Sequence, residues 1–104
     1  LQPIVPVVEI ARLHRGQKKM AVASGGFRHV VERQLVHIGV SDWFDTIVAA
    51  EDTARHKPEP DVFLEAARRL GVAPQHCEVY EDSDLGIEAA RRAGMQWVDV
   101  RKYH

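Results

Sequence analysis

An acidic pair, Glu81 and Asp82, follows the short apolar run at residues 79–80 and precedes a segment with helical periodicity. In an open parallel sheet, ligands bind beyond the carboxyl ends of the strands, so both carboxylates are expected to face a crevice. Mg²⁺ takes one or two protein carboxylates and completes its shell with water and phosphate oxygens. Alternatively, Asp82, Ser83 and Asp84 only cap the following helix, whose N-terminus favours acceptors and negative charge. The pair is therefore a candidate magnesium site.

Two further polar groups lie at the end of a predicted strand or in the loop that follows one. Ser24 ends one run, and Gly25 and Gly26 come directly after it. A hydroxyl and unhindered backbone N–H groups before a helix can bind phosphate, and the alternative is a glycine-rich turn with a capping serine. Lys57 precedes Pro58, which restricts it to an extended backbone. Its ammonium can neutralise charge that develops on a transferring phosphoryl group, although most lysines are simply exposed.

The order of apolar segments predicts the fold class. Strands are predicted at residues 19–24, 46–50, 78–81 and 97–100, and helices at residues 6–15, 27–38, 61–70 and 84–93. Phe27 is expected on the apolar face of the second helix. Such alternation is typical of an α/β fold with a parallel sheet and helices on its faces.

Length and charge exclude several classes of protein. A chain of 104 residues with 45% hydrophobic content forms at most one small domain. Its 14 basic and 15 acidic residues supply no general attraction to nucleic acid or to an anionic membrane. The apolar runs are far shorter than the roughly 20 residues that span a bilayer. Cys77 is the single cysteine, and no signal segment is evident, so we expect a cytoplasmic protein without disulfides.

The three motifs, in this order, resemble those of the haloacid dehalogenase-like (HAD) hydrolases, in the branch of β-phosphoglucomutase and the sugar-phosphate phosphatases. Residues 21–26 resemble the motif whose serine or threonine binds the phosphoryl group, and Lys57 resembles the motif lysine that balances charge. Glu81 and Asp82 resemble the acidic residues that hold Mg²⁺. Arg28 begins the helix after the glycines and is a further candidate substrate contact, with solvation on the helix surface as the alternative. The expected sites are catalytic Ser24 and Lys57, phosphate-binding Ser24, Gly25, Gly26, Arg28 and Lys57, and metal-binding Glu81 and Asp82.

One part of the family pattern is absent. Family members carry a nucleophilic Asp in an Asp-x-Asp-Gly-Thr motif on the first strand, followed by a helical cap, and this sequence has no such motif. The resemblance therefore implies that residues 1–104 are the C-terminal part of a HAD-like core domain, with the nucleophile strand and cap in a missing N-terminal half of the same protein.

The family's sheet has the strand order 5-4-1-2-3, and the four predicted strands correspond to strands 2 to 5. Without the central strand 1, its two neighbours must pair directly or leave backbone groups unpaired, at a cost of about 1–3 kcal/mol for each buried group. A stable fold then needs the N-terminal half, a strand from a partner chain, or a rearranged pairing.

The resemblance implies an Mg²⁺-dependent phosphatase that acts on a small phosphorylated sugar through an aspartyl-phosphate intermediate. Because the nucleophile lies outside this chain, we expect the 104 residues alone to be inactive. One alternative is a β-phosphoglucomutase-like phosphotransferase, which shares the three motifs. An alternative of another class is a catalytically dead module that binds phosphate or metal.

Overall fold

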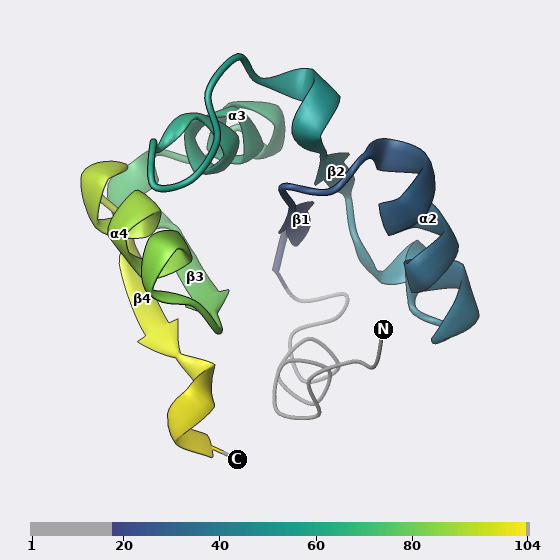
Figure 1. Cartoon of the computed structure of the whole chain (residues 1–104). Coiled ribbons are helices and arrows are strands. Elements are labelled where there is room, and N and C mark those ends of the chain that lie inside the picture. The colour runs from purple at the N-terminus through teal and green to yellow at the C-terminus, as the bar shows by residue number, and fades with distance from the viewer. Residues whose placement is uncertain (1–17, 104) are drawn as a thin grey trace.

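A computed structural model describes residues 18–103 of the chain, and the helix predicted at residues 6–15 lies outside this part. The described residues form an α/β fold, as predicted, with four short strands and three α-helices (Figure 1). The strands are β1 (Ala21–Ala23), β2 (Thr46–Val48), β3 (Glu78–Glu81) and β4 (Gln96–Asp99). The helices are α2 (Arg28–His37), α3 (Asp61–Leu70) and α4 (Asp84–Arg92).

The strands form two separate parallel pairs. β1 pairs with β2 in the register Ala21 to Thr46, and β3 pairs with β4 in the register Glu78 to Gln96. Within residues 18–103, β1 and β3 are not hydrogen-bonded to each other. The structure therefore does not close the sheet by direct pairing of these two strands, which was one of the arrangements considered from the sequence.

Helix α3 joins the two strand pairs. Its buried residues Phe63, Ala66 and Ala67 belong to one apolar cluster with Val48 of β2 and Val79 of β3. This helix contacts β1, β2 and α4, and Figure 1 shows it between the two halves of the fold. Small alanine side chains let the backbones approach closely, so a single helix can hold both pairs around one core.

The structure corrects some predicted boundaries. The predicted strand at residues 46–50 ends at Val48, because Ala50–Asp52 form a 3₁₀ turn, η2. The last strand ends at Asp99, and Val100 begins another 3₁₀ turn. Phe27 was expected on the buried face of its helix, but it precedes α2 and is 60% exposed. Its helical spacing to Val31 was therefore misleading, since Phe27 has extended backbone angles.

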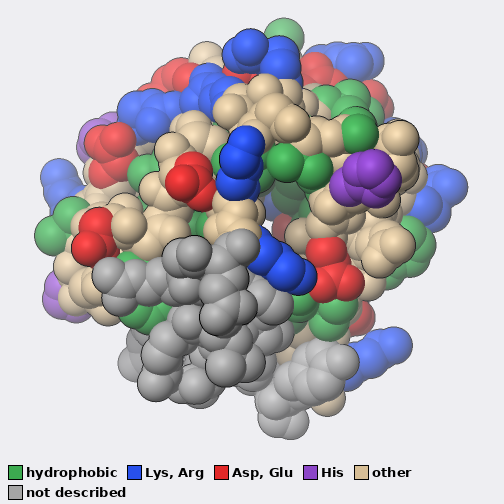
Figure 2. All heavy atoms as spheres, turned by 180° about the vertical axis from the view of Figure 1, so that it is seen from behind, with side chains coloured by type: hydrophobic (Ala, Val, Ile, Leu, Met, Phe, Trp, Pro, Cys, Tyr) green, Lys and Arg blue, Asp and Glu red, His purple; other side chains and the backbone are tan. Residues whose placement is uncertain are grey.

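The described surface carries charges of both signs. On the face seen in Figure 2, the described residues place Lys and Arg side chains among Asp and Glu side chains, without a broad region of one sign. None of the helices within residues 18–103 combines the length and the apolar composition that crossing a bilayer requires.

Candidate functional site

Lys57 and Glu81, which are 24 positions apart, meet at the end of β3. The Lys57 ammonium lies 3.0 Å from Oε2 of Glu81 and 5.0 Å from the centre of the Phe63 ring. Glu81 is buried, with 9% of its surface exposed, and the Lys57 side chain is 20% exposed. Two candidate residues from different motifs thus form one ion pair, which compensates the charge of a buried carboxylate.

The turn after β3 is built around the Glu81 carboxylate. Oε1 of Glu81 accepts hydrogen bonds from the backbone N–H of Asp82 at 2.9 Å and from the Ser83 hydroxyl at 3.2 Å. The same hydroxyl accepts from the backbone N–H of Gly86 at 3.0 Å and so caps α4. Since Ser83 provides the cap, the start of α4 does not require the exposed Asp82 carboxylate.

The two neighbouring carboxyl groups have opposite pKa shifts. Burial disfavours the charged form of Glu81, but the charge and hydrogen bond of Lys57 outweigh it and lower its pKa. A hydrogen bond with Glu81, burial and the charge of Glu81 together raise the pKa of Asp82. The pair therefore combines an ionised, buried carboxylate with a more basic, exposed one at the carboxyl end of β3.

Ser24, Gly25 and Gly26 form a tight turn between β1 and α2. The backbone N–H of Ser24 donates to the Val48 carbonyl at 2.8 Å, which continues the β1–β2 ladder. The Ser24 hydroxyl accepts from the backbone N–H of Gly26 at 3.0 Å. A serine hydroxyl has one hydrogen to donate as well as its acceptor lone pairs, so this contact leaves Ser24 able to donate to a phosphate oxygen.

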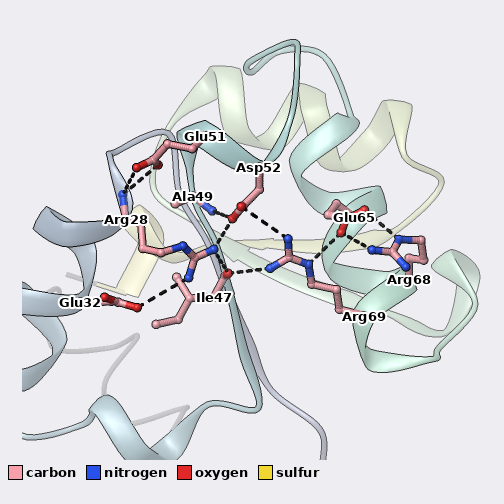
Figure 3. A network of polar contacts seen from close by, with 9 residues as sticks. All are labelled: Arg28, Glu32, Ile47, Ala49, Glu51, Asp52, Glu65, Arg68 and Arg69. Carbon is pink, nitrogen blue, oxygen red and sulfur yellow. Dashed lines mark hydrogen bonds and ion pairs between the residues drawn. The ribbon is translucent and has the colours of Figure 1, made fainter.

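Arg28 has protein partners in this structure. Its guanidinium donates to the Ile47 carbonyl at 2.8 Å and forms an ion pair with Asp52 (Figure 3). Its contact with a substrate therefore stays a prediction, as do the roles of the other candidate residues.

Sequence reasoning missed the acidic pair Glu51 and Asp52 in η2. Both oxygens of Glu51 accept from the backbone N–H of Arg28, at 2.9 and 3.1 Å. Asp52 accepts from the Ala49 backbone at 2.8 Å and pairs with Arg28 and, at 3.5 Å, with Arg69. A signal was present in the sequence, because Glu51 and Asp52 come shortly after β2 in the same way that Glu81 and Asp82 stand at the end of β3.

The carboxylates at the end of β3 match part of what Mg²⁺ requires. Glu81 and Asp82 offer two adjacent carboxylates, which is the number that Mg²⁺ takes when water and phosphate oxygens supply the other ligands. Within residues 18–103, no group of three His, Cys, Asp or Glu side chains is arranged to hold a metal ion. The two carboxylates therefore fit one side of a magnesium site that further ligands would complete.

Two phosphatases are similar in sequence to this chain. A fructose-1-phosphate phosphatase of Escherichia coli (strain K12) is 46% identical over 97 residues, which are 93% of this chain and 52% of that protein. A glyceraldehyde 3-phosphate phosphatase of Methanopyrus kandleri is 35% identical over 85 residues, covering 81% of this chain and 36% of that protein. The chain thus spans about half or less of the length of these two relatives.

Solved structures share the fold. A putative β-phosphoglucomutase from Thermotoga maritima has a TM-score of 0.84 and 28% identity, and the match covers 89% of this chain and 44% of the Thermotoga chain. A β-phosphoglucomutase from Clostridium difficile has a TM-score of 0.82 and 32% identity, and the match covers 89% of this chain and 41% of the Clostridium chain. The family model described as haloacid dehalogenase-like hydrolase matches residues 2–100, so the chain belongs to the haloacid dehalogenase-like hydrolases.

Proposed function

We propose that this chain supplies the phosphate-binding and charge-balancing part of an Mg²⁺-dependent phosphatase for small sugar phosphates. The observation that carries the proposal is the Lys57–Glu81 ion pair of 3.0 Å with Asp82 beside it, at the carboxyl end of a parallel strand. The 46% identity to a fructose-1-phosphate phosphatase favours a phosphorylated sugar as the substrate.

Each residue has a role that its contacts support. Ser24 donates its hydroxyl hydrogen to a phosphoryl oxygen, and the Gly25–Gly26 backbone lets the phosphoryl group approach. Lys57 neutralises negative charge as the phosphoryl group is transferred, and the Glu81 carboxylate holds the Lys57 ammonium in place. Glu81 and Asp82 would hold Mg²⁺, which screens the charge on the phosphate when it is bound.

The nucleophile is proposed to be an aspartate in an N-terminal half of the same protein. Its carboxylate attacks phosphorus, the ester P–O bond breaks, and the sugar leaves as an alcohol after it takes up a proton. Water then cleaves the aspartyl phosphate, which releases inorganic phosphate and restores the carboxylate. Two observations support a further half: β1 and β3 are unpaired with each other within residues 18–103, and the compared relatives are about twice as long.

A β-phosphoglucomutase-like phosphotransferase is the second candidate. The structural matches to the two β-phosphoglucomutases favour it, and the residues that bind phosphate would have the same roles. The two candidates differ in product, because a phosphatase releases inorganic phosphate and a mutase returns an isomeric sugar phosphate.

The test compares the chain alone with the chain joined to the N-terminal half of its parent protein. With fructose 1-phosphate and Mg²⁺, we expect the joined protein to release inorganic phosphate and the chain alone to show no turnover. Lys57→Ala and Asp82→Asn are each expected to lower kcat/KM by at least about 10²-fold, as is typical when one stabilising charge is removed. Glu32→Gln, on the exposed side of α2, is the control and should keep the activity of the joined protein.

Two results would contradict the proposal. Release of phosphate by the chain alone would mean that its own residues include a nucleophile. A joined protein that binds Mg²⁺ and phosphate without turnover of any sugar phosphate would favour the catalytically dead module.

A further inference from the structure

Glu51 reaches the start of α2 from another element. The residue before α2, Phe27, has no side chain that can cap the helix, and the first helical N–H, that of Arg28, donates to both oxygens of Glu51. The capping carboxylate is thus 23 positions away in the sequence and comes from η2. A helix N-terminus favours such an anion, because its first backbone N–H groups have no partner within the helix.

Two neighbouring contacts tie the same turn to η2 and β2. The backbone N–H of Ala50 donates to the Gly26 carbonyl at 2.9 Å, on the other side of Phe27. The Arg28 side chain pairs with Asp52 and donates to Ile47. The last residue of the Ser24–Gly26 turn and the first residue of α2 are therefore both held by residues 47–52.

We propose that Glu51 is a positioning residue for the phosphate-binding turn, with two separable effects. Its carboxylate oxygens determine where α2 begins and so hold the turn in shape. Its negative charge opposes a phosphate bound by the same turn and lowers the affinity for that anion. The second effect depends on the proposed function, because it requires that the Ser24–Gly26 turn binds phosphate.

Two variants separate these effects. Glu51→Gln keeps a side-chain oxygen that can accept from the Arg28 N–H but removes the charge, whereas Glu51→Ala removes both. The matched control is Glu32→Gln. Glu32 is also acidic and lies 3.6 Å from the Arg28 guanidinium, but one helical turn away from the backbone N–H that Glu51 caps.

The first measurement is hydrogen exchange at the Arg28 amide by NMR, in the whole 104-residue chain without phosphate. We expect Glu51→Ala to speed exchange by roughly 10-fold or more relative to neighbouring α2 amides, and Glu51→Gln to keep most of the protection. Unchanged protection in Glu51→Ala would overturn the positioning effect.

The second measurement is a titration of the chain joined to its N-terminal half with inorganic phosphate, followed at the amides of residues 24–26. We expect Glu51→Gln to bind phosphate about 2- to 5-fold more tightly than the wild type at low salt, and this gain to shrink in high salt because exposed charges are screened. Glu32→Gln should bind like the wild type. If Glu51→Gln binds phosphate as tightly as the wild type, or more weakly, the charge effect is overturned.

The two measurements also separate this inference from the proposed function. If phosphate shifts no turn resonance in any variant, the phosphate site and the charge effect are both wrong. The exchange rate of the Arg28 amide still decides the positioning effect, because that measurement uses no ligand.

Discussion

At the scale of single residues, Gly86 shows why the turn after β3 has this composition. A Cβ at this position would lie 2.0 Å from Cδ and 2.2 Å from Oε2 of Glu81. Both distances are far below van der Waals contact, and Glu81 is buried and paired with Lys57. The glycine therefore makes room for the carboxylate that Lys57 and the turn require.

We expect Gly86→Ala to push the Glu81 side chain away from Lys57 and to lower the free energy of unfolding by about 1–3 kcal/mol. Urea denaturation measures this change. Gly25→Ala is the matched control, because a Cβ at position 25 would meet nothing within 4 Å. Its effect on stability should stay within about 0.5 kcal/mol. Equal stability of the two variants would show that Glu81 has another place to lie.

At the scale of secondary-structure elements, α3 and α4 contain the same segment, Glu-Ala-Ala-Arg-Arg, in which both arginines bind the glutamate. In α3, Arg68 and Arg69 bind Glu65 and lower its pKa to about 2. The second arginine also reaches out of the helix, since Arg69 donates to the Ile47 carbonyl at 3.0 Å.

Ile47 lies in β2, and its carbonyl faces away from β1. Successive carbonyls of a strand alternate in direction, and the next carbonyl, that of Val48, points toward β1 because it accepts from Ser24. Arg28 and Arg69 therefore cover the outer edge of β2, where an unpaired strand would invite association (Figure 3).

This difference between the two arginines gives a prediction for α3. Arg69→Ala should lower the free energy of unfolding by about 1–2 kcal/mol, because it removes a partner of the Ile47 carbonyl and of Asp52. Arg68→Ala, which removes an exposed contact with Glu65, should change it by less than about 0.5 kcal/mol. Thermal denaturation of both variants at low protein concentration measures the comparison. A larger loss for Arg68→Ala would contradict the assignment of Arg69 to the strand edge.

At the scale of the whole molecule, the two strand pairs leave the inner edge of β1 without a strand partner among residues 18–103. The bond from Ser24 to Val48 places the Val22 amide on the side of β2, so the amides of Ala21 and Ala23 face the opposite edge. In the proposed parent protein, this edge pairs with the strand that carries the nucleophile.

We therefore expect the amides of Ala21 and Ala23 to exchange quickly in the 104-residue chain and at least roughly 10²-fold more slowly in the protein joined to its N-terminal half. The increase in protection at these two positions should exceed that of the Val22 amide, which is paired with β2 in both proteins. Hydrogen exchange followed by NMR measures all three. If Ala21 and Ala23 exchange at the same rate in both proteins, the added half does not pair with β1.

Local patterns in the sequence were sufficient for the elements and the motif residues. The alternation of apolar and polar residues predicted the α/β class, the four described strands and the end of α3 at Leu70, which Gly71 follows with a φ of +70°. The order of the Ser24, Lys57 and Glu81–Asp82 motifs pointed to the family that the comparisons show. The elements depend on backbone preferences and on short spacings, which are properties of neighbouring residues, whereas the family came from the resemblance of the three motifs to known ones.

Only the tertiary structure decided which distant groups meet. It brought Lys57 to Glu81, turned Arg28 toward Asp52, and placed Glu51 at the start of α2. It also separated the strands into two pairs held by α3. Such contacts join residues more than 20 positions apart, and the sequence spacing of a charged residue does not reveal which partner the packing of the core will bring within reach. The sequence thus determined the candidate chemistry, and the packing of α3 against both strand pairs determined how its residues are arranged.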